Sequence, residues 1–203
     1  MRLLLDTDAF CKLAAGGLLD DAIAHLGGDM ATCGRLAALP HMLRRGKLRR
    51  TLGAETCDAI LAVAEALPVI GQPTSKWLDG LAHIDSIDPG EAQIFAFAAE
   101  TSAVVLSGDK RALRALKAVQ GLPQLISGRI VVMEAILIGL CERLGVDEIR
   151  RRVQPIVAWD KMIQICFSPT NLKPQDALRS YFRSLASELE PIVLWSPGGE
   201  GNS

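Results

Sequence analysis

The stretch that decides the fold is Arg2-Leu3-Leu4-Leu5-Asp6-Thr7-Asp8, near the start of the chain. Three consecutive leucines that stop at a polar Asp-Thr-Asp are typical of a short buried strand that ends in a turn. Residues 9–15 then carry a helical pattern that stops at Gly16-Gly17. We therefore predict a strand over 2–5 that passes directly into a helix, as in the first half of a βαβ unit.

The same alternation continues through the middle of the chain. Further short strands are expected at 30–32, 83–85, 103–106 and 129–132. Helices are expected at 18–26, 35–43, 54–67, 89–100, 110–119 and 134–144. Strands that alternate with helices favour an α/β fold, in which a parallel sheet is covered by helices on both faces.

Beyond about residue 145 the pattern is wholly helical, most clearly over 147–152 and 175–189. The second of these segments carries an apolar stripe at helical spacing, which must pack on the domain itself or on a second copy of the chain. We predict an α/β domain over 1–133, a helical C-terminal extension over 134–196 and a flexible tail over 197–203.

Composition sets limits on the class of protein. The 203 residues carry a formal net charge of -1, with 49% hydrophobic and 22% charged residues, which excludes a disordered chain and a strongly basic nucleic-acid binder. We see neither a secretory signal nor an apolar run long enough to span a membrane. The five cysteines form no C-x-x-C pair and are interpreted as reduced thiols in the core of a cytoplasmic protein.

Three carboxylates follow three of the predicted strands. Asp6 comes directly after the first strand, Glu91 follows the stretch 83–85, and Asp109 follows the strand 103–106 by three residues. The carboxyl ends of parallel strands are where open α/β sheets bind ligands. A cluster of like charges requires a cation, and oxygen ligands without Cys or His suit Mg²⁺ or Mn²⁺. Such an ion could activate water for attack on a phosphate.

Each acidic residue also has a purely structural interpretation, and both interpretations stay open from the residues alone. The stretch Asp88-Pro89-Gly90-Glu91 is a good capping box with proline at the first helical position. Ser107 could cap the following helix, with Asp109 favourable in its first turn, and Asp6 or Asp8 could cap the first helix.

The sequence resembles the PIN-domain nucleases. Three stretches in this order carry the resemblance: LLLDTD at 3–8, DPGEA at 88–92 and VLSGDKRAL at 105–113. The family typically shows an L-L-D-T-N/D start, a G-E-A helix start and a T/S-x-D turn followed by basic and small residues. The resemblance covers residues 1–133, and no single stretch is specific without the others.

The resemblance implies a three-layer α/β/α sandwich around a parallel sheet, and Mg²⁺- or Mn²⁺-dependent hydrolysis of RNA phosphodiester bonds. It implies that Asp6, Glu91 and Asp109 hold the metal and that the Ser107 hydroxyl supports the site. Many small members are toxins with a protein antitoxin, so an antitoxin partner is expected here, and we also expect a homodimer.

Two positions depart from the family pattern. Ala38 stands where the family commonly has a glutamate early in the helix after the second strand, and Gly108 stands where many members have a second aspartate. Thr7, Asp8 and Asp88 are further candidates beside the site, and either of these two aspartates could supply a missing carboxylate. A site of three carboxylates would bind one metal ion rather than two, or bind weakly.

Basic residues suggest where RNA could lie. Lys110 and Arg111 directly follow Asp109, so they could contact the phosphate backbone independently of base sequence. The dense basic run from Arg44 and Arg45 to residue 50 could do the same or could bind an acidic partner. The run 150–152 is interpreted as a solvated face.

Three other functions compete with a nuclease. The first is a degenerate PIN domain that binds RNA or protein without cutting, which Ala38 and Gly108 motivate. The second is a phosphatase of the haloacid dehalogenase type, because Asp6-Thr7-Asp8 looks like the D-x-D start of that family. That reading leaves Glu91 unused, and a later aspartate of that family is missing. The third is a structural or assembly protein whose main feature is the C-terminal helix.

Overall fold

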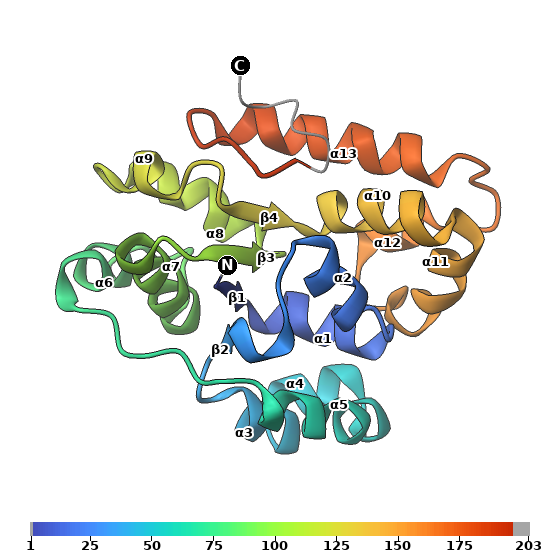
Figure 1. The fold of residues 1–203 in the computed structure, drawn as a ribbon, viewed down its shortest axis with the longest axis horizontal. Helices are drawn as coiled ribbons and strands as arrows, with labels where there is room; N and C mark the ends of the chain where they lie inside the picture. Colours follow the sequence, from blue (N-terminus) through green and yellow to red (C-terminus); the bar gives the residue numbers. More distant parts are fainter. Residues whose placement is uncertain (1, 197–203) are drawn as a thin grey trace.

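The computed structural model describes residues 2–196 and contains one parallel sheet in the middle of the molecule (Figure 1). Its strands are β1 (Leu3–Leu5), β2 (Cys33–Arg35), β3 (Val104–Ser107) and β4 (Ile130–Val132), in the order β2-β1-β3-β4. Val69 adds a parallel bridge beside Arg35, and Leu194 adds one beside Ile130, so each edge is extended by a short contact.

The strands are buried on both faces because their side chains alternate between two hydrophobic clusters. Leu3 and Leu5 belong to one cluster and Leu4 to the other, and β3 divides in the same way between Leu106 and Val105. Continuous apolar strands of this kind are expected when helices cover both faces of a parallel sheet. The predicted α/β fold, a parallel sheet with helices on both faces, is confirmed.

The helices divide between the two clusters. Those that pack mainly on the first cluster are α1 (Thr7–Ala15), α2 (Leu19–His25), α3 (Leu39–Arg44), α4 (Lys47–Leu52), α5 (Ala54–Ala66), α10 (Met133–Leu144), α11 (Val146–Arg152) and α12 (Lys161–Cys166). Those that pack on the second are α6 (Ser75–Ala82), α7 (Pro89–Thr101), α8 (Lys110–Ala115) and α9 (Leu122–Ile126). Three short 3-10 turns are η1 (Met30–Thr32), η2 (Leu116–Ala118) and η3 (Gln154–Ile156).

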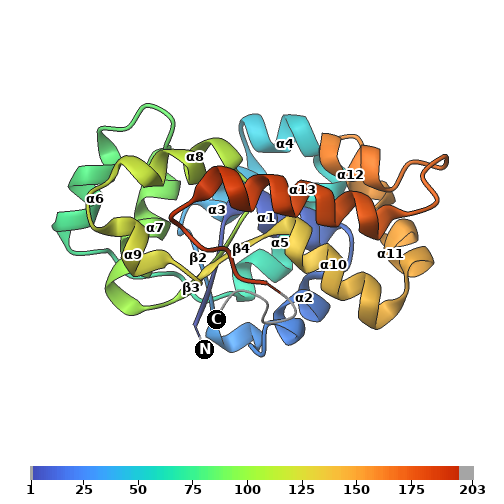
Figure 2. The ribbon, with the colours of Figure 1, turned by 90° about the horizontal axis from the view of Figure 1, so that it is seen from above.

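The last long helix, α13 (Pro174–Leu189), lies across the molecule and packs along α10 (Figure 2). Its Leu178 is buried in the first cluster, and its Leu185 and Leu189 are buried in the second. The apolar stripe predicted here is therefore covered by the domain itself. The boundary predicted at residue 133 stays a prediction, although α10 begins there and shares the core with the strands. The predicted flexible tail lies outside the described residues.

Two predicted strands are wrong. The stretch 83–85 is a turn between α6 and α7, in which the Ile84 amide donates to the Leu81 carbonyl at 3.1 Å and the Ile87 amide donates to the Ile84 carbonyl at 2.9 Å. Its apolar content is a single isoleucine, and the capping box that follows fixes the start of the next helix. Glu91 therefore does not follow a strand.

The second error concerns residues 30–32, which form a 3-10 turn instead of a strand. The Asp29 side chain accepts from the Thr32 amide, and the Thr32 side chain accepts from the Asp29 amide, so the turn is closed by its own capping box. The strand comes directly afterwards, at β2, and the helix predicted from residue 35 begins only at Leu39. The helices α4, α6 and α9 lie where the sequence predicts no helix, and all three are short, with five to eight residues. The helix α12 lies in the C-terminal part that the sequence predicts to be wholly helical.

All five cysteines are buried and none forms a disulfide, which matches their interpretation as small core residues. Over residues 2–196, none of the helices combines the length and the apolar character that crossing a bilayer requires.

Candidate functional site

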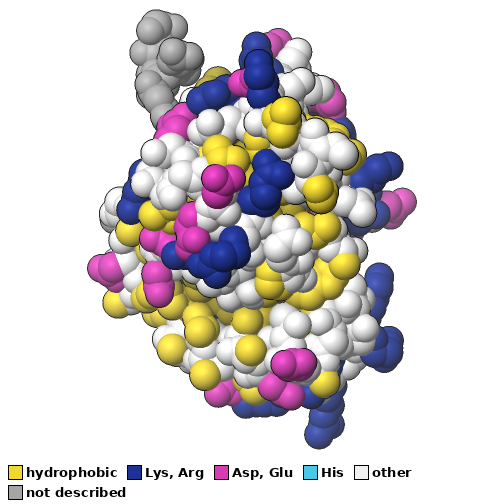
Figure 3. All heavy atoms as spheres, turned by 90° about the vertical axis from the view of Figure 1, so that its right-hand side faces the viewer, with side chains coloured by type: hydrophobic (Ala, Val, Ile, Leu, Met, Phe, Trp, Pro, Cys, Tyr) yellow, Lys and Arg dark blue, Asp and Glu magenta, His cyan; other side chains and the backbone are white. Residues whose placement is uncertain are grey.

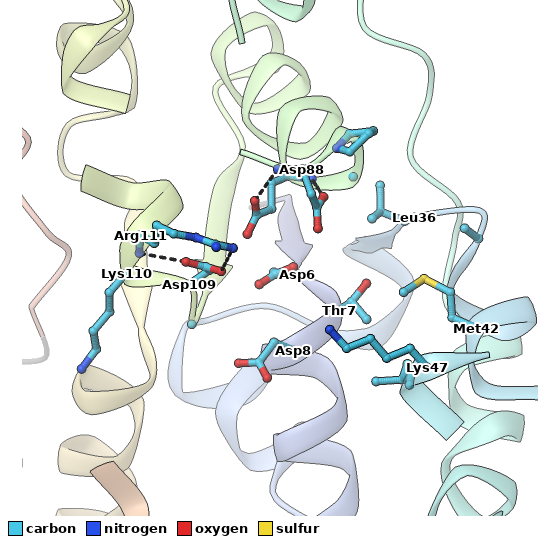
Figure 4. Close-up of a pocket in the computed structure, with 16 residues that line it drawn as sticks. Asp6, Thr7, Asp8, Leu36, Met42, Lys47, Asp88, Asp109, Lys110 and Arg111 are labelled. Atoms are coloured by element: carbon cyan, nitrogen blue, oxygen red, sulfur yellow. Dashed lines mark hydrogen bonds and ion pairs between the residues drawn. The ribbon is translucent and has the colours of Figure 1, made fainter. Parts of the chain in front are cut away.

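A cavity of about 860 Å³ opens at the carboxyl end of the sheet, where the sequence predicts a site. Five carboxylates line it: Asp6, Asp8, Asp88, Glu91 and Asp109. Figure 4 shows the four aspartates pointing toward a shared space. The cavity thus brings together all three predicted metal ligands and both additional acids. Glu91 reaches it from the start of a helix instead of from a strand.

Asp6 is placed by the end of the central strand. Its amide donates to the Leu106 carbonyl at 3.0 Å, which continues the ladder between β1 and β3. Asp6 occupies the N-cap position of α1 but makes no capping hydrogen bond with its side chain. Asp6 is only 7% exposed, so its carboxyl group is a buried acid that makes no capping bond. Asp6 is therefore the N-cap residue by position, as expected, but its side chain does not cap the helix.

Ser107 and Asp109 are placed by the end of β3. The buried Ser107 hydroxyl donates to Asp6 Oδ2 at 3.4 Å, which agrees with the expected supporting role. Asp109 caps α8 through Oδ1, which accepts from the amides of Arg111 at 2.8 Å and Ala112 at 3.0 Å. The expected cap at Ser107 is therefore wrong: Asp109 is itself the N-cap of α8, and it also lines the cavity.

Asp88 and Glu91 form the predicted capping box at the start of α7. Asp88 Oδ1 accepts from the Glu91 amide and Glu91 Oε2 accepts from the Asp88 amide, each at 2.8 Å. The box holds both side chains at the cavity wall, and Glu91 is only 6% exposed. Capping and site formation are therefore two consequences of one local motif.

The two most buried acids of the cavity have strongly raised pKa values. Burial raises the pKa of Asp6 to about 7, and the charges of Asp8 and Asp88 contribute to the increase. Burial raises the pKa of Glu91 to about 7 as well, with further contributions from Asp88, Asp109 and Asp6. Such shifts mean that the ionised forms lack sufficient compensation from the protein. A bound cation would supply that compensation.

Of the four predicted RNA-contacting residues, Lys110 and Arg111 line the cavity, whereas Arg44 and Arg45 are not among its lining residues. Arg111 lines the cavity with its guanidinium 3.6 Å from Asp109 Oδ2. Lys110 is also at the wall, but Figure 4 shows its side chain turned away, and its amino group pairs with the buried Glu134 at 2.5 Å. Arg44 pairs with Glu65 on the surface.

Arg45, the other predicted basic contact, is exposed on the surface and is not among the residues that line this cavity. Lys47, at the start of α4, belongs to the basic run that is expected to contact phosphates or an acidic partner, and it reaches toward Thr7 and Asp8 (Figure 4). The sequence gives no signal that this lysine of the run lies at the cavity, because its place depends on the fold. Sequence reasoning missed Leu36 and Met42, which add apolar wall.

Both departures from the PIN pattern lie in this cavity. Ala38 lines it and supplies no carboxylate. At Gly108, a Cβ atom would lie only 2.6 Å from Asp8 Oδ2. The Asp8 carboxylate therefore occupies the space into which a side chain at position 108 would project.

The oxygen donors around the cavity are of the type that Mg²⁺ and Mn²⁺ prefer. Within residues 2–196, however, no three Asp, Glu, His or Cys side chains are already close enough to share one ion. The donor chemistry fits a hard cation, and the side chains would have to close on it.

Comparisons of this chain with models of protein families, with curated proteins and with solved structures gave no match.

Proposed function

We propose that this chain is a Mg²⁺- or Mn²⁺-dependent nuclease that hydrolyses RNA phosphodiester bonds, as its resemblance to PIN-domain nucleases implies. The observation that carries the proposal is the cavity itself, which five carboxylates from separate parts of the sequence line at the carboxyl end of the sheet. Burial raises the pKa of both Asp6 and Glu91 to about 7, so the ionised carboxylate cluster is electrostatically unfavourable at neutral pH without a cation.

In this proposal Asp6, Glu91 and Asp109 hold the ion. A bound divalent ion lowers the pKa of water and neutralises charge on a phosphate that is under attack. Ser107 fixes the orientation of the Asp6 carboxylate through the hydroxyl contact at 3.4 Å. Arg111 and Lys47, which line the cavity, are placed to contact phosphates on either side of the cleaved bond, in a way that does not depend on base sequence.

A catalytically degenerate domain that binds RNA or protein is the second candidate. Ala38 favours it, because this part of the wall supplies no carboxylate. The haloacid-dehalogenase-like phosphatase has less support, because Asp88 and Glu91 face the same cavity and that chemistry leaves them unused. An antitoxin partner and a homodimer stay predictions of the resemblance and the sequence.

The test is cleavage of a labelled single-stranded RNA of mixed sequence by the purified chain in the presence of MnCl₂. We expect cleavage that stops when the metal is chelated and that Asp6→Asn abolishes. The matched control is Asp79→Asn, which changes an exposed aspartate on α6 and should leave the rate unchanged. A folded wild-type chain that binds RNA with Mn²⁺ present and does not cut it would support the degenerate domain instead.

A further inference from the structure

A buried lysine lies beside the carboxylate cavity. Lys12 is on α1, one turn after Asp8, and its side chain is only 10% exposed. Its amino group lies 2.6 Å from Asp8 Oδ2 and 2.6 Å from Asp160 Oδ2. Lysine is rarely buried unless it is paired, so these two contacts hold a fixed positive charge inside the protein.

Asp160 comes from the C-terminal helical part of the chain, 148 residues after Lys12. It caps α12 by accepting from the Ile163 amide at 2.9 Å, and its side chain is 13% exposed. One oxygen of Asp160 thus fixes the helix and the other fixes the lysine. The C-terminal segment therefore helps to determine where the Lys12 ammonium lies.

The ammonium lies close to position 108, at the wall of the cavity. A Cβ atom at Gly108 would be 3.8 Å from Lys12 Nζ and 2.6 Å from Asp8 Oδ2. Glycine here leaves room for the ion pair in the space where a larger residue would project. Asp8 Oδ2, the cavity carboxylate oxygen nearest this position, is already bound to an internal cation.

Sites for phosphoryl transfer often use two divalent ions held by shared carboxylates. Here Lys12 supplies a positive charge at one side of the cluster, while Asp6, Glu91 and Asp109 remain on the other. We propose that the Lys12 ammonium replaces a second divalent ion by holding Asp8 in an internal ion pair, so that the site binds a single metal ion. The inference rests on the proposed function, and Lys12 acts in it as a positioning residue through Asp8.

The test is the number of Mn²⁺ ions bound per chain, measured without RNA by the electron paramagnetic resonance signal of free Mn²⁺. The wild type should bind one ion. Lys12→Met keeps an unbranched side chain, one atom shorter, and removes its charge, so Asp8 becomes available and the variant should bind two. The double variant Lys12→Met, Asp8→Asn should return to one ion. Lys161→Met, an exposed lysine on α12, is the control and should stay at one.

A second measurement keeps the inference testable if Lys12→Met does not fold. Asp8 is about half exposed, so Asp8→Asn should fold, and it should still bind one ion because Asp8 is not a ligand. Asp8→Asn that loses Mn²⁺ binding overturns the inference, as does a folded Lys12→Met that binds one ion. If the wild type binds one ion and cleaves RNA, and Lys12→Met also binds one ion, only the inference about Lys12 is overturned. A wild type that binds none overturns the proposed function as well.

Discussion

Two glutamates of this molecule have opposite electrostatic surroundings. Glu148, on α11, accepts hydrogen bonds from Arg151 at 2.7 and 3.0 Å and from Arg152 at 2.6 Å, and these contacts lower its pKa to about 2. Glu91 lies in the cavity, where burial raises its pKa to about 7 and neighbouring carboxylates contribute. The negative charge of a glutamate is thus well compensated around α11 and poorly compensated in the cavity.

The two regions differ in how far the protein itself compensates their charges. Around α11 the charges are compensated within the protein, because Arg152 also pairs with Asp21 at 2.7 Å. Figure 3 shows the face that includes this helix, with acidic and basic side chains next to one another. Five carboxylates line the cavity against Lys47, Lys110 and Arg111, and Lys110 already pairs with Glu134. In the proposed function a divalent cation, which has the right chemistry, compensates the remaining negative charge.

The largest effect expected from this comparison is on RNA cleavage. Glu91→Gln keeps the shape of the side chain and removes the charge, so it should lower the rate of Mn²⁺-dependent cleavage by roughly 10²–10³-fold, as is typical when one electrostatic contact to the reaction is lost. Glu148→Gln is the matched control and should leave the rate unchanged. Equal rates of cleavage for Glu91→Gln and the wild type would show that the charge of Glu91 has no role in the reaction.

A smaller effect is expected on the stability of the metal-free protein. The pKa of Asp6 is about 7 in the fold and near its ordinary value of 3.8 in the unfolded chain, so folding favours its protonated form. The folded state is therefore most favoured below pH 4 with respect to this group, and that advantage is lost as pH rises through 7. Asp6→Asn should accordingly stabilise the metal-free chain at pH 8 by roughly 1–3 kcal/mol and should stabilise it by a smaller amount at pH 5.

Thermal unfolding at both pH values in the presence of a chelator measures this effect, with Asp79→Asn as the control. Glu148 should behave in the opposite sense. Its lowered pKa adds stability above its ordinary pKa of 4.5, and this contribution is lost as pH falls toward 2. If Asp6→Asn instead lowers the free energy of unfolding at pH 8, the protein itself compensates the charge of Asp6 in the cavity.

The smallest effect is expected at Gly108. A Cβ atom there would meet Asp8 Oδ2 at 2.6 Å, so Gly108→Ala should displace the Asp8–Lys12 pair and destabilise the fold by about 1 kcal/mol. The control is Gly80→Ala, within α6, where the nearest atom would be 3.8 Å away. Because alanine favours helix, that change should stabilise the protein by about 0.5–1 kcal/mol. Chemical denaturation measures the free energy of unfolding of both variants. A gain in stability for Gly108→Ala equal to that of Gly80→Ala would show that the Asp8–Lys12 pair does not lie beside position 108.

The sequence predicts this region well where a local motif determines the structure. Leu3–Leu5 followed by Asp6 predicts both the strand and the position of its acid, and the box from Asp88 to Glu91 predicts both a helix start and two cavity carboxylates. The expected strand at 83–85 failed because three residues with one isoleucine cannot distinguish a strand from a turn.

Contacts between distant parts of the chain could not be predicted. The Asp8–Lys12 spacing of four residues on one helix is a visible signal of an ion pair. Its second partner, Asp160, lies in a part of the chain where only the tertiary fold reveals its neighbours. The same holds for Lys47, whose place at the cavity depends on how α4 packs.

The central claim is that the carboxylate cavity binds a divalent cation, and calorimetric titration of the metal-free chain with MnCl₂ at pH 7 tests it most directly. Measurement in two buffers of different protonation enthalpy also gives the number of protons released. We predict binding with release of protons from Asp6 and Glu91, and loss of that binding in Asp109→Asn. The absence of binding, or binding that Asp109→Asn leaves unchanged, would contradict it.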